Sequence, residues 1–274
     1  MSNSNIRSYT LGPLTVLELS APEIISVAAH AGYDAVGLRL LPSTPGGIYH
    51  PLIEDKQLLA RTLQCMSETG VRVYDLEIVR INEQFDANGY KAFLDTGAEL
   101  GAQCVLVAGD DPDLSRFSDN FAAFCDACQP YGMKPNLEFM PWTEVKDLRQ
   151  AMNIVASINR PNAGVLIDAI HFDRSHSLVS DIQRIPVEQL HYAQICDAPA
   201  EKPSSEAEVI RQAREERLLP GAGGIPLDAI FSRLPKEMPV CVEIPSPHLG
   251  DAGNRARLAL EATKSWFSRH IDRE

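Results

Sequence analysis

Short apolar runs alternate with longer amphipathic segments along nearly the whole chain. The apolar runs have the length of buried strands, and the segments between them carry apolar residues at helical spacing. This alternation is typical of a parallel sheet covered by helices. Strands are predicted at residues 9–17, 34–40, 71–78, 103–108, 133–139, 163–168, 189–196 and 240–244, the first of them interrupted by Gly12 and Pro13.

Helices are predicted between these strands, and several carry clear start and stop signals. Pro22 and Gly32 flank the first one, and Thr143 is predicted to cap the helix before the sixth strand. The predicted helices span residues 21–31, 54–69, 88–100, 117–131, 143–158, 179–184, 206–217, 225–234 and 250–270.

The length of 274 residues is close to the ~250 residues of a (β/α)8 TIM barrel. No Ser/Gly-rich linker or charge block divides the chain, so we expect one domain over residues 1–274. An open doubly wound sheet also alternates strands and helices. The sequence has neither a G-x-G-x-x-G motif after an early strand nor a G-x-x-x-x-G-K-[ST] motif, which favours the barrel.

The formal net charge is −12. An acidic surface disfavours binding to nucleic acid and to anionic membranes, but it leaves a small anionic substrate possible because a cleft has its own local field. The first residues lack the apolar segment of a signal peptide, and no apolar run approaches the ~20 residues of a membrane span. We therefore expect a cytoplasmic protein.

Four strand ends carry side chains that can bind a metal through oxygen: Glu138, Asp168, Gln194 and Glu243. The first two intervals match one β/α unit of ~30 residues, and the third leaves room for an extra loop and helix. Strand carboxyl ends converge on one face of a parallel barrel, where active sites lie. One acidic residue at a strand end is more often a loop cap or an ion-pair partner. Three acidic residues and one amide at these intervals predict a shared divalent cation.

Three carboxylates and an amide form an all-oxygen ligand set, which favours Mn²⁺ or Mg²⁺ over zinc. Such ligands must lose their protons to bind, so low pH is expected to release the metal.

Further polar residues lie close to these strand ends in sequence. His171, three residues after Asp168, is a candidate acid or base. Arg174 and Arg217 are candidates to hold a carboxylate, phosphate or hydroxyl of the substrate through their planar guanidinium groups. Arg39 and Glu77 are lesser candidates for substrate binding, and an internal ion pair accounts for them equally well.

Four short motifs carry a resemblance to a known family: Asn136-Leu137-Glu138, Asp168-Ala169-Ile170-His171, Gln194-Ile195-Cys196-Asp197-Ala198-Pro199 and Val242-Glu243. In these the chain resembles the xylose-isomerase-like barrel superfamily of sugar isomerases and epimerases. The resemblance implies that the four strand-end positions bind one divalent metal and that the His after the Asp binds substrate. Members of this superfamily often pair, so the resemblance leaves a homodimer open.

The sequence departs from many sugar epimerases at Gln194, where those proteins have His. A Gln there, followed by Arg217-Leu218-Leu219-Pro220-Gly221-x-Gly223, is similar to bacterial dehydroshikimate dehydratases of the same superfamily. The departure keeps a lyase open beside an epimerase.

The first functional hypothesis is a metal-dependent isomerase or epimerase of a small polyhydroxylated sugar or polyol ketone. Glu138 or Glu243 would remove a proton from the carbon beside the carbonyl and form an enediolate. The alternative is a dehydratase in which His171 is the base and a β-hydroxyl leaves as water.

Two further classes fit less well. A DNA-cleaving enzyme of this superfamily binds its metals through many His residues and must approach DNA, and a chain with only seven His residues and a net charge of −12 fits this poorly. A binding protein that has lost catalysis is disfavoured because the full set of four metal ligands is present.

Overall fold

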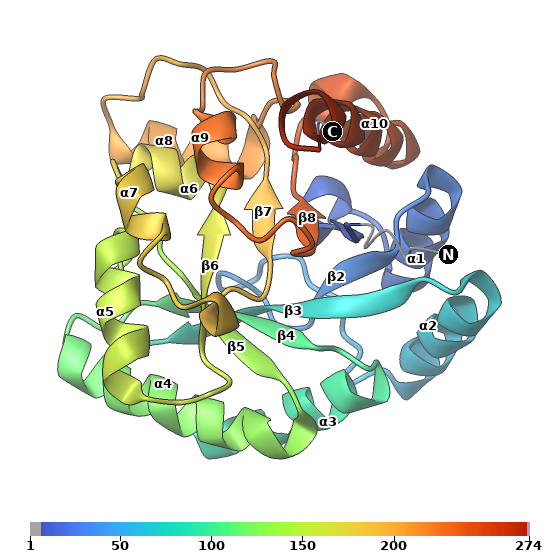
Figure 1. Cartoon of the computed structure of the whole chain (residues 1–274). Helices are drawn as coiled ribbons and strands as arrows, with labels where there is room; N and C mark the ends of the chain where they lie inside the picture. The colour runs from blue at the N-terminus through green and yellow to red at the C-terminus, as the bar shows by residue number, and fades with distance from the viewer. Residues whose placement is uncertain (1–6, 273–274) are drawn as a thin grey trace, which may run out of the picture.

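Eight parallel strands close into a barrel in which each strand pairs with its neighbours in chain order and β1 pairs with β8 (Figure 1). The structure is a computed structural model and describes residues 7–272. The strands are β1 (Tyr9–Leu11), β2 (Ala35–Arg39), β3 (Arg72–Ile81), β4 (Cys104–Gly109), β5 (Lys134–Glu138), β6 (Gly164–Asp168), β7 (Ala193–Ile195) and β8 (Val240–Val242). The predicted (β/α)8 TIM barrel is confirmed. The remaining ends of the predicted domain, residues 1–6 and 273–274, lie outside the described residues.

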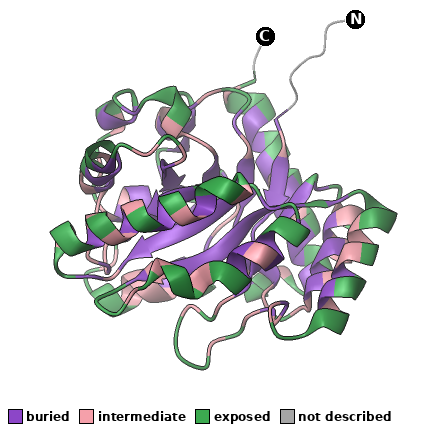
Figure 2. Ribbon diagram, turned by 90° about the horizontal axis from the view of Figure 1, so that it is seen from below, coloured by how far each residue is buried: buried purple, intermediate pink, exposed green. Residues whose placement is uncertain are grey.

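Helices surround the barrel and expose their outer faces while the strands stay buried (Figure 2). The α-helices are α1 (Ala21–Ala31), α2 (Lys56–Thr69), α3 (Lys91–Glu99), α4 (Leu114–Cys128), α5 (Leu148–Ile158), α6 (Ala169–Arg174), α7 (Val179–Ile182), α8 (Glu206–Glu215), α9 (Leu227–Phe231) and α10 (Ala252–His270). Short 3-10 helices lie at Pro13–Val16, Ala87–Tyr90, Gln129–Tyr131, Val187–Gln189 and Pro247–Leu249. Within residues 7–272, none of the helices combines the length and apolar character that crossing a membrane requires.

The alternation of side chains along the strands separates two cores. Outward residues such as Leu137, Val165 and Val242 pack against the helices, and inward residues such as Leu106 and Leu166 fill the barrel. The barrel filling ends at the carboxyl ends of the strands, where the inward residues become polar. A layer of polar side chains at the strand ends therefore lies above the apolar filling of the barrel, and we call this layer the floor of the site.

The register brings the predicted ligands to the same level. Asp168 pairs with Gln194 across β6 and β7, and Glu138 pairs with Leu166 across β5 and β6. Glu243 follows the last residue of β8, and its backbone N–H donates to Ile195 O at 3.2 Å. The closed, in-order barrel is what brings residues more than one hundred positions apart into one layer.

Several predicted boundaries are corrected. The first strand is only three residues long, because Gly12 and Pro13 turn the chain into a 3-10 helix. The third strand extends to Ile81, three residues past its predicted end. The helix predicted from Thr143 begins at Leu148 and is capped by Asp147, which accepts from the N–H of Gln150. The Thr143 hydroxyl instead lies within reach of the carbonyls of Met140 and Val145 in a buried turn.

Candidate metal centre and pocket

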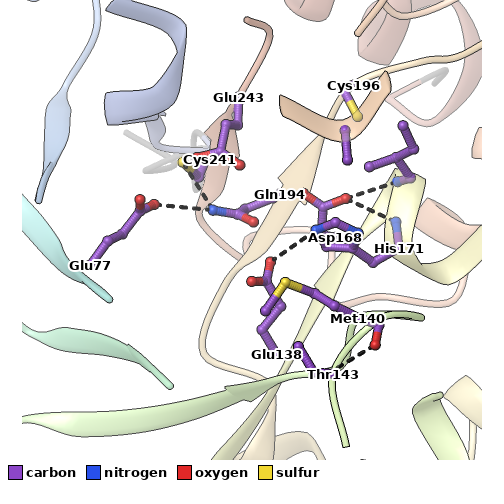
Figure 3. Close-up of polar contacts among 12 residues, drawn as sticks. Glu77, Glu138, Met140, Thr143, Asp168, His171, Gln194, Cys196, Cys241 and Glu243 are labelled. Atoms are coloured by element: carbon purple, nitrogen blue, oxygen red, sulfur yellow. Dashed lines mark hydrogen bonds and ion pairs between the residues drawn. The ribbon is translucent and has the colours of Figure 1, made fainter. Parts of the chain in front are cut away.

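The four predicted ligands are all buried at the carboxyl end of the barrel. Glu138 and Asp168 are the last residues of β5 and β6, Gln194 is the middle residue of β7, and Glu243 follows β8. Each is at most 4% exposed. Figure 3 shows Glu138, Asp168, Gln194 and His171 turned toward one another. Burying so many polar groups without partners is unfavourable, so this site calls for compensating charge.

Glu138, Asp168 and His171 each offer one ligand atom, and these three atoms lie within 4.8 Å of one another. His171 Nε2 is 3.8 Å from Glu138 Oε1. The Asp168 carboxylate also caps α6, since its Oδ1 accepts from the N–H groups of Ile170 and His171 at 2.8 and 3.2 Å. The cap orients both the carboxylate and the helix that carries the imidazole.

Gln194 carries its amide between the carboxylates and Glu77. Its Nε2 donates to Glu77 Oε1 at 3.5 Å, which leaves the amide oxygen facing Asp168 and Glu138 (Figure 3). Reversing the amide would let nitrogen donate to Asp168 Oδ2 and Glu138 Oε1, each at 3.0 Å. Without a cation the reversed amide is better satisfied. Three oxygens facing one another are the arrangement that a hard divalent cation fits.

Arg217 supplies positive charge to the same carboxylates. Its Nη1 donates to Asp168 Oδ2 at 2.6 Å, and its Nη2 lies 3.2 Å from Glu243 Oε2. Its Nε donates to the carbonyl of Ala213 at 2.7 Å, which fixes the guanidinium plane. Arg217 lines the pocket as predicted for a substrate contact, but most of its donors are already engaged by the protein. It links Glu243 to Asp168.

Burial and mutual repulsion set the protonation of this group. Burial, followed by the charges of Asp168 and Glu243, raises the pKa of Glu138 well above its usual range. Burial and then the Glu77 charge raise the pKa of Glu243 to about 8. Burial also acts on Asp168, but the Arg217 guanidinium lowers the pKa of this carboxyl below its ordinary value. A cation entering near neutral pH would therefore displace protons from glutamates.

A pocket of about 280 Å³ opens above these residues. Burial lowers the pKa of His171 to about 4, so its imidazole is neutral at pH 7. The Trp142 indole packs edge-on against it, with ring centroids 5.0 Å apart. Trp142 Nε1 and His171 Nδ1 are buried and have no hydrogen-bond partner among the described residues. Both belong to residues that line the pocket, and the protein itself leaves them unpaired.

Of the other residues predicted to bind substrate, two line the pocket and one does not. Arg39 and Glu77 line the pocket and form an internal ion pair, with Nη2 3.0 Å from Oε2. Arg174 does not line it, contrary to the expectation of a substrate contact. Its guanidinium donates to Asp173 at 2.5 Å and to the carbonyl of Pro199 at 2.8 Å. These bonds tie α6 to the segment before α8 and turn the group away from the cleft.

Several residues that line the pocket were not predicted from the sequence, chiefly Arg80, Arg214, Leu106 and Met140. Arg80 lies beyond the predicted end of its strand. Arg214 sits on a polar helix, where no pattern distinguishes the side chain that faces the cleft. The spacing to Arg217 is the signal that could have identified Arg214, because residues three positions apart on a helix lie on the same face.

In parallel (β/α)8 barrels, active sites lie at the carboxyl ends of the strands, which is where this acidic group lies. A family model described as xylose isomerase-like TIM barrel matches residues 25–269, and the chain belongs to that family. The chain is 29% identical to the inosose isomerase of Bacillus velezensis over 266 residues, covering 89% of this chain and 90% of that protein.

Other relatives match over shorter stretches. The inosose isomerase of Bacillus licheniformis is 32% identical over 155 residues, covering 53% of this chain and 54% of that protein. The 3-dehydroshikimate dehydratase of Pseudomonas aeruginosa is 26% identical over 135 residues, covering 48% of this chain and 20% of that protein. In such matches the chain spans about half or less of the relative's length.

Solved structures share the fold. The crystal structure of an IOLI protein with a bound zinc atom aligns with a TM-score of 0.78 at 21% identity. The alignment covers 97% of this chain and 100% of that chain.

Proposed function

We propose that this protein is a divalent-metal-dependent isomerase or epimerase of a small polyhydroxylated ketone. The observation that carries the proposal is the convergence of oxygens from Glu138, Asp168 and Gln194, with Glu243 beside them, at the floor of a pocket of substrate size. The relatives named inosose isomerase support this reaction class. The wholly oxygen ligand set favours Mn²⁺ or Mg²⁺, and the zinc in a structural neighbour supports a divalent ion.

Glu138, Asp168, Gln194 and Glu243 would hold the ion. When bound, the ion polarises the substrate carbonyl and so acidifies the neighbouring C–H. Glu138 lines the pocket and, within residues 7–272, forms no ion pair with an arginine, so its carboxylate is the candidate base. Glu243 lines the same pocket and contacts Arg217. Its carboxyl group is therefore a second group in the cleft that can carry a proton.

In this scheme Glu138 removes the proton beside the carbonyl and leaves an enediolate. Trp142 Nε1 donates a hydrogen bond to a substrate oxygen, and neutral His171 donates or accepts one. Return of this proton by Glu138 to the neighbouring carbon gives the isomer. A proton delivered to the opposite face by Glu243 gives the epimer, with Glu243 protonated rather than bound to the ion and Glu138 keeping the proton that it removed. Enclosure by Trp142 and Met140 keeps bulk water from the reacting carbon.

A dehydratase is the second candidate, and His171 is the observation that favours it. A neutral imidazole lines the pocket, and its Nε2 is 3.8 Å from Glu138 Oε1. The imidazole can remove the proton from carbon and pass it to the β-hydroxyl, which then leaves as water. The relative named 3-dehydroshikimate dehydratase supports this alternative.

The test is hydrogen exchange in deuterated buffer with Mn²⁺ and a panel of polyhydroxy ketones. Isomerisation gives deuterium on carbon without loss of water, and dehydration gives a product lighter by one water. We expect Glu138→Gln to lower exchange by at least about 100-fold, as loss of a general base does. Glu99→Gln, an exposed change on α3, is the control and should exchange normally. Full exchange by Glu138→Gln with metal bound would rule out Glu138 as the base.

A further inference from the structure

Three arginines line the same pocket as the carboxylates and form what we call the arginine cluster: Arg39, Arg80 and Arg214. Arg39 ends β2, Arg80 lies in β3, and Arg214 lies in α8. Their exposure increases in that order, since the side chains of Arg39 and Arg80 are 9% and 24% exposed and Arg214 is exposed at the mouth. The cluster therefore runs from the buried floor to the entrance.

The protein satisfies these guanidinium groups only in part. Arg39 pairs with Glu77 through Nη2, but its buried Nε has no partner among the described residues. Arg80 uses Nε and Nη2 in a fork to Asp110, at 2.5 and 2.7 Å, which leaves Nη1. Arg214 forms no ion pair or side-chain hydrogen bond within residues 7–272. The cluster thus presents unused N–H donors to the cavity.

The charges around the cluster do not cancel. Glu77 and Asp110 offset two of the three positive charges, and one remains. Partial burial and then the charges of Arg80 and Arg39 lower the pKa of Arg214, while the neighbouring Glu215 acts in the opposite direction. The charges of Arg80 and Arg39 therefore disfavour the cationic form of Arg214. Cations held together in a cleft of an acidic protein create a local positive field, and such a field attracts an anion.

We propose that the substrate carries an anionic group, a carboxylate or a phosphate, which binds at the arginine cluster while the ketone end lies over Glu138. A planar guanidinium binds both anions through paired N–H donors. This inference rests on the proposed function, because it assigns the two ends of one substrate. If the arginine cluster binds an anionic group, neutral polyol ketones are poorer substrates than ketones that carry a carboxylate or a phosphate.

The test compares compounds that share a six-carbon chain and differ in one terminal group, which is neutral or anionic. Gluconate and glucitol share their chain of hydroxyls, and glucitol 6-phosphate distinguishes phosphate from carboxylate. Their binding to the purified chain is measured by calorimetry with Mn²⁺ and again with a chelator. The variants are Arg214→Gln, Arg214→Lys and, as control, Arg211→Gln. Arg211 lies on the same helix but pairs with Glu208 and Glu216 outside the pocket.

We expect at least one of the anions to bind about tenfold or more tightly than glucitol. Arg214→Gln should remove most of that difference, Arg214→Lys should restore part of it, and Arg211→Gln should leave it unchanged. Equal binding of all three compounds overturns the proposal. An anion preference that survives in Arg214→Gln, or falls equally in Arg211→Gln, overturns it as well.

The same experiment separates the two proposals. Anion binding that depends on Arg214 without any carbon-bound exchange leaves the anion subsite standing and rejects the isomerase. Exchange on neutral and acidic ketones with equal efficiency rejects the subsite and leaves the isomerase standing. Carboxylate and phosphate are told apart by which of the two anions loses more affinity in Arg214→Gln.

Discussion

Arg217 is the residue on which the charge balance of the site depends. It donates to Asp168 and contacts Glu243, and all three side chains are nearly fully buried. A buried charge is tolerated when it is paired and hydrogen-bonded. The guanidinium therefore makes it possible for the barrel to keep several carboxylates in one layer when no cation is bound.

Replacing Arg217 with Gln should destabilise the metal-free protein by about 3–5 kcal/mol, because it leaves buried carboxylates without their partner. Mn²⁺ should restore part of this stability, since a cation replaces the lost charge. Denaturant unfolding with Mn²⁺ and with a chelator measures both effects. Arg211→Gln is the control, and because its ion pairs lie at the surface it should leave the stability nearly unchanged. An equal loss with and without metal would show that Arg217 acts independently of the cation site.

For single residues, the sequence was sufficient to place the polar side chains at the strand ends. It was not sufficient to identify the helix residues that line the pocket. Glu138 and Asp168 follow apolar runs, and residue type and spacing together suffice to place them. Arg174 and Arg214 both lie on helices, and the sequence does not say which one faces the cleft. That choice depends on how α6 and α8 pack, which is a tertiary property.

Asp197 organises the segment that carries Arg217. Its carboxylate accepts hydrogen bonds of 2.8–3.0 Å from the backbone N–H groups of Ala198, Gly221, Gly223 and Ile225. A backbone pair between Asp197 and Leu218 adds two bonds of 2.8 Å. Gly223 is needed for this close approach, since a Cβ there would lie 2.2 Å from the carbonyl oxygen of Ala198.

Asp197→Asn should therefore loosen the segment from Arg217 to Ile225. An amide offers one oxygen and places its NH₂ against backbone donors, so we expect a loss of about 2–3 kcal/mol. Hydrogen exchange should show faster exchange at Gly221 and Gly223, and unfolding measures the stability. Asp119→Asn, an exposed change, is the matched control. Unchanged protection of the two glycine amides would mean that the segment is held by other contacts.

Element boundaries show where local signals fail. Thr143 and Asp147 are both good helix caps by residue type. The chain uses Asp147 because the turn before it buries the Thr143 hydroxyl against two carbonyls. The third strand likewise continues past its predicted end because it pairs with β4 as far as Ile81. Pairing and burial override local preference in both cases.

For the whole molecule, the alternation of apolar runs and amphipathic segments predicted a parallel sheet covered by helices. The chain length and the absence of nucleotide-binding motifs favoured the closed eight-stranded barrel over an open sheet. The net charge of −12 describes the surface, while the pocket carries its own balance of acidic floor and arginine cluster. A homodimer and a cytoplasmic location stay predictions. Everything proposed for the chemistry depends on one claim, that the strand ends hold a divalent cation.

Titration of the metal-free protein with Mn²⁺ by calorimetry, from pH 6 to pH 8 and in buffers of different ionisation enthalpy, tests this claim most directly. The account predicts one ion per chain. Glu138 and Glu243 have raised pKa values and hold protons that the ion must displace. Affinity should therefore rise with pH, by up to about tenfold per unit for each proton released, and Asp168→Asn should abolish binding. No uptake of Mn²⁺, Mg²⁺ or Zn²⁺ at millimolar concentration, or binding unaffected by Asp168→Asn, would contradict it.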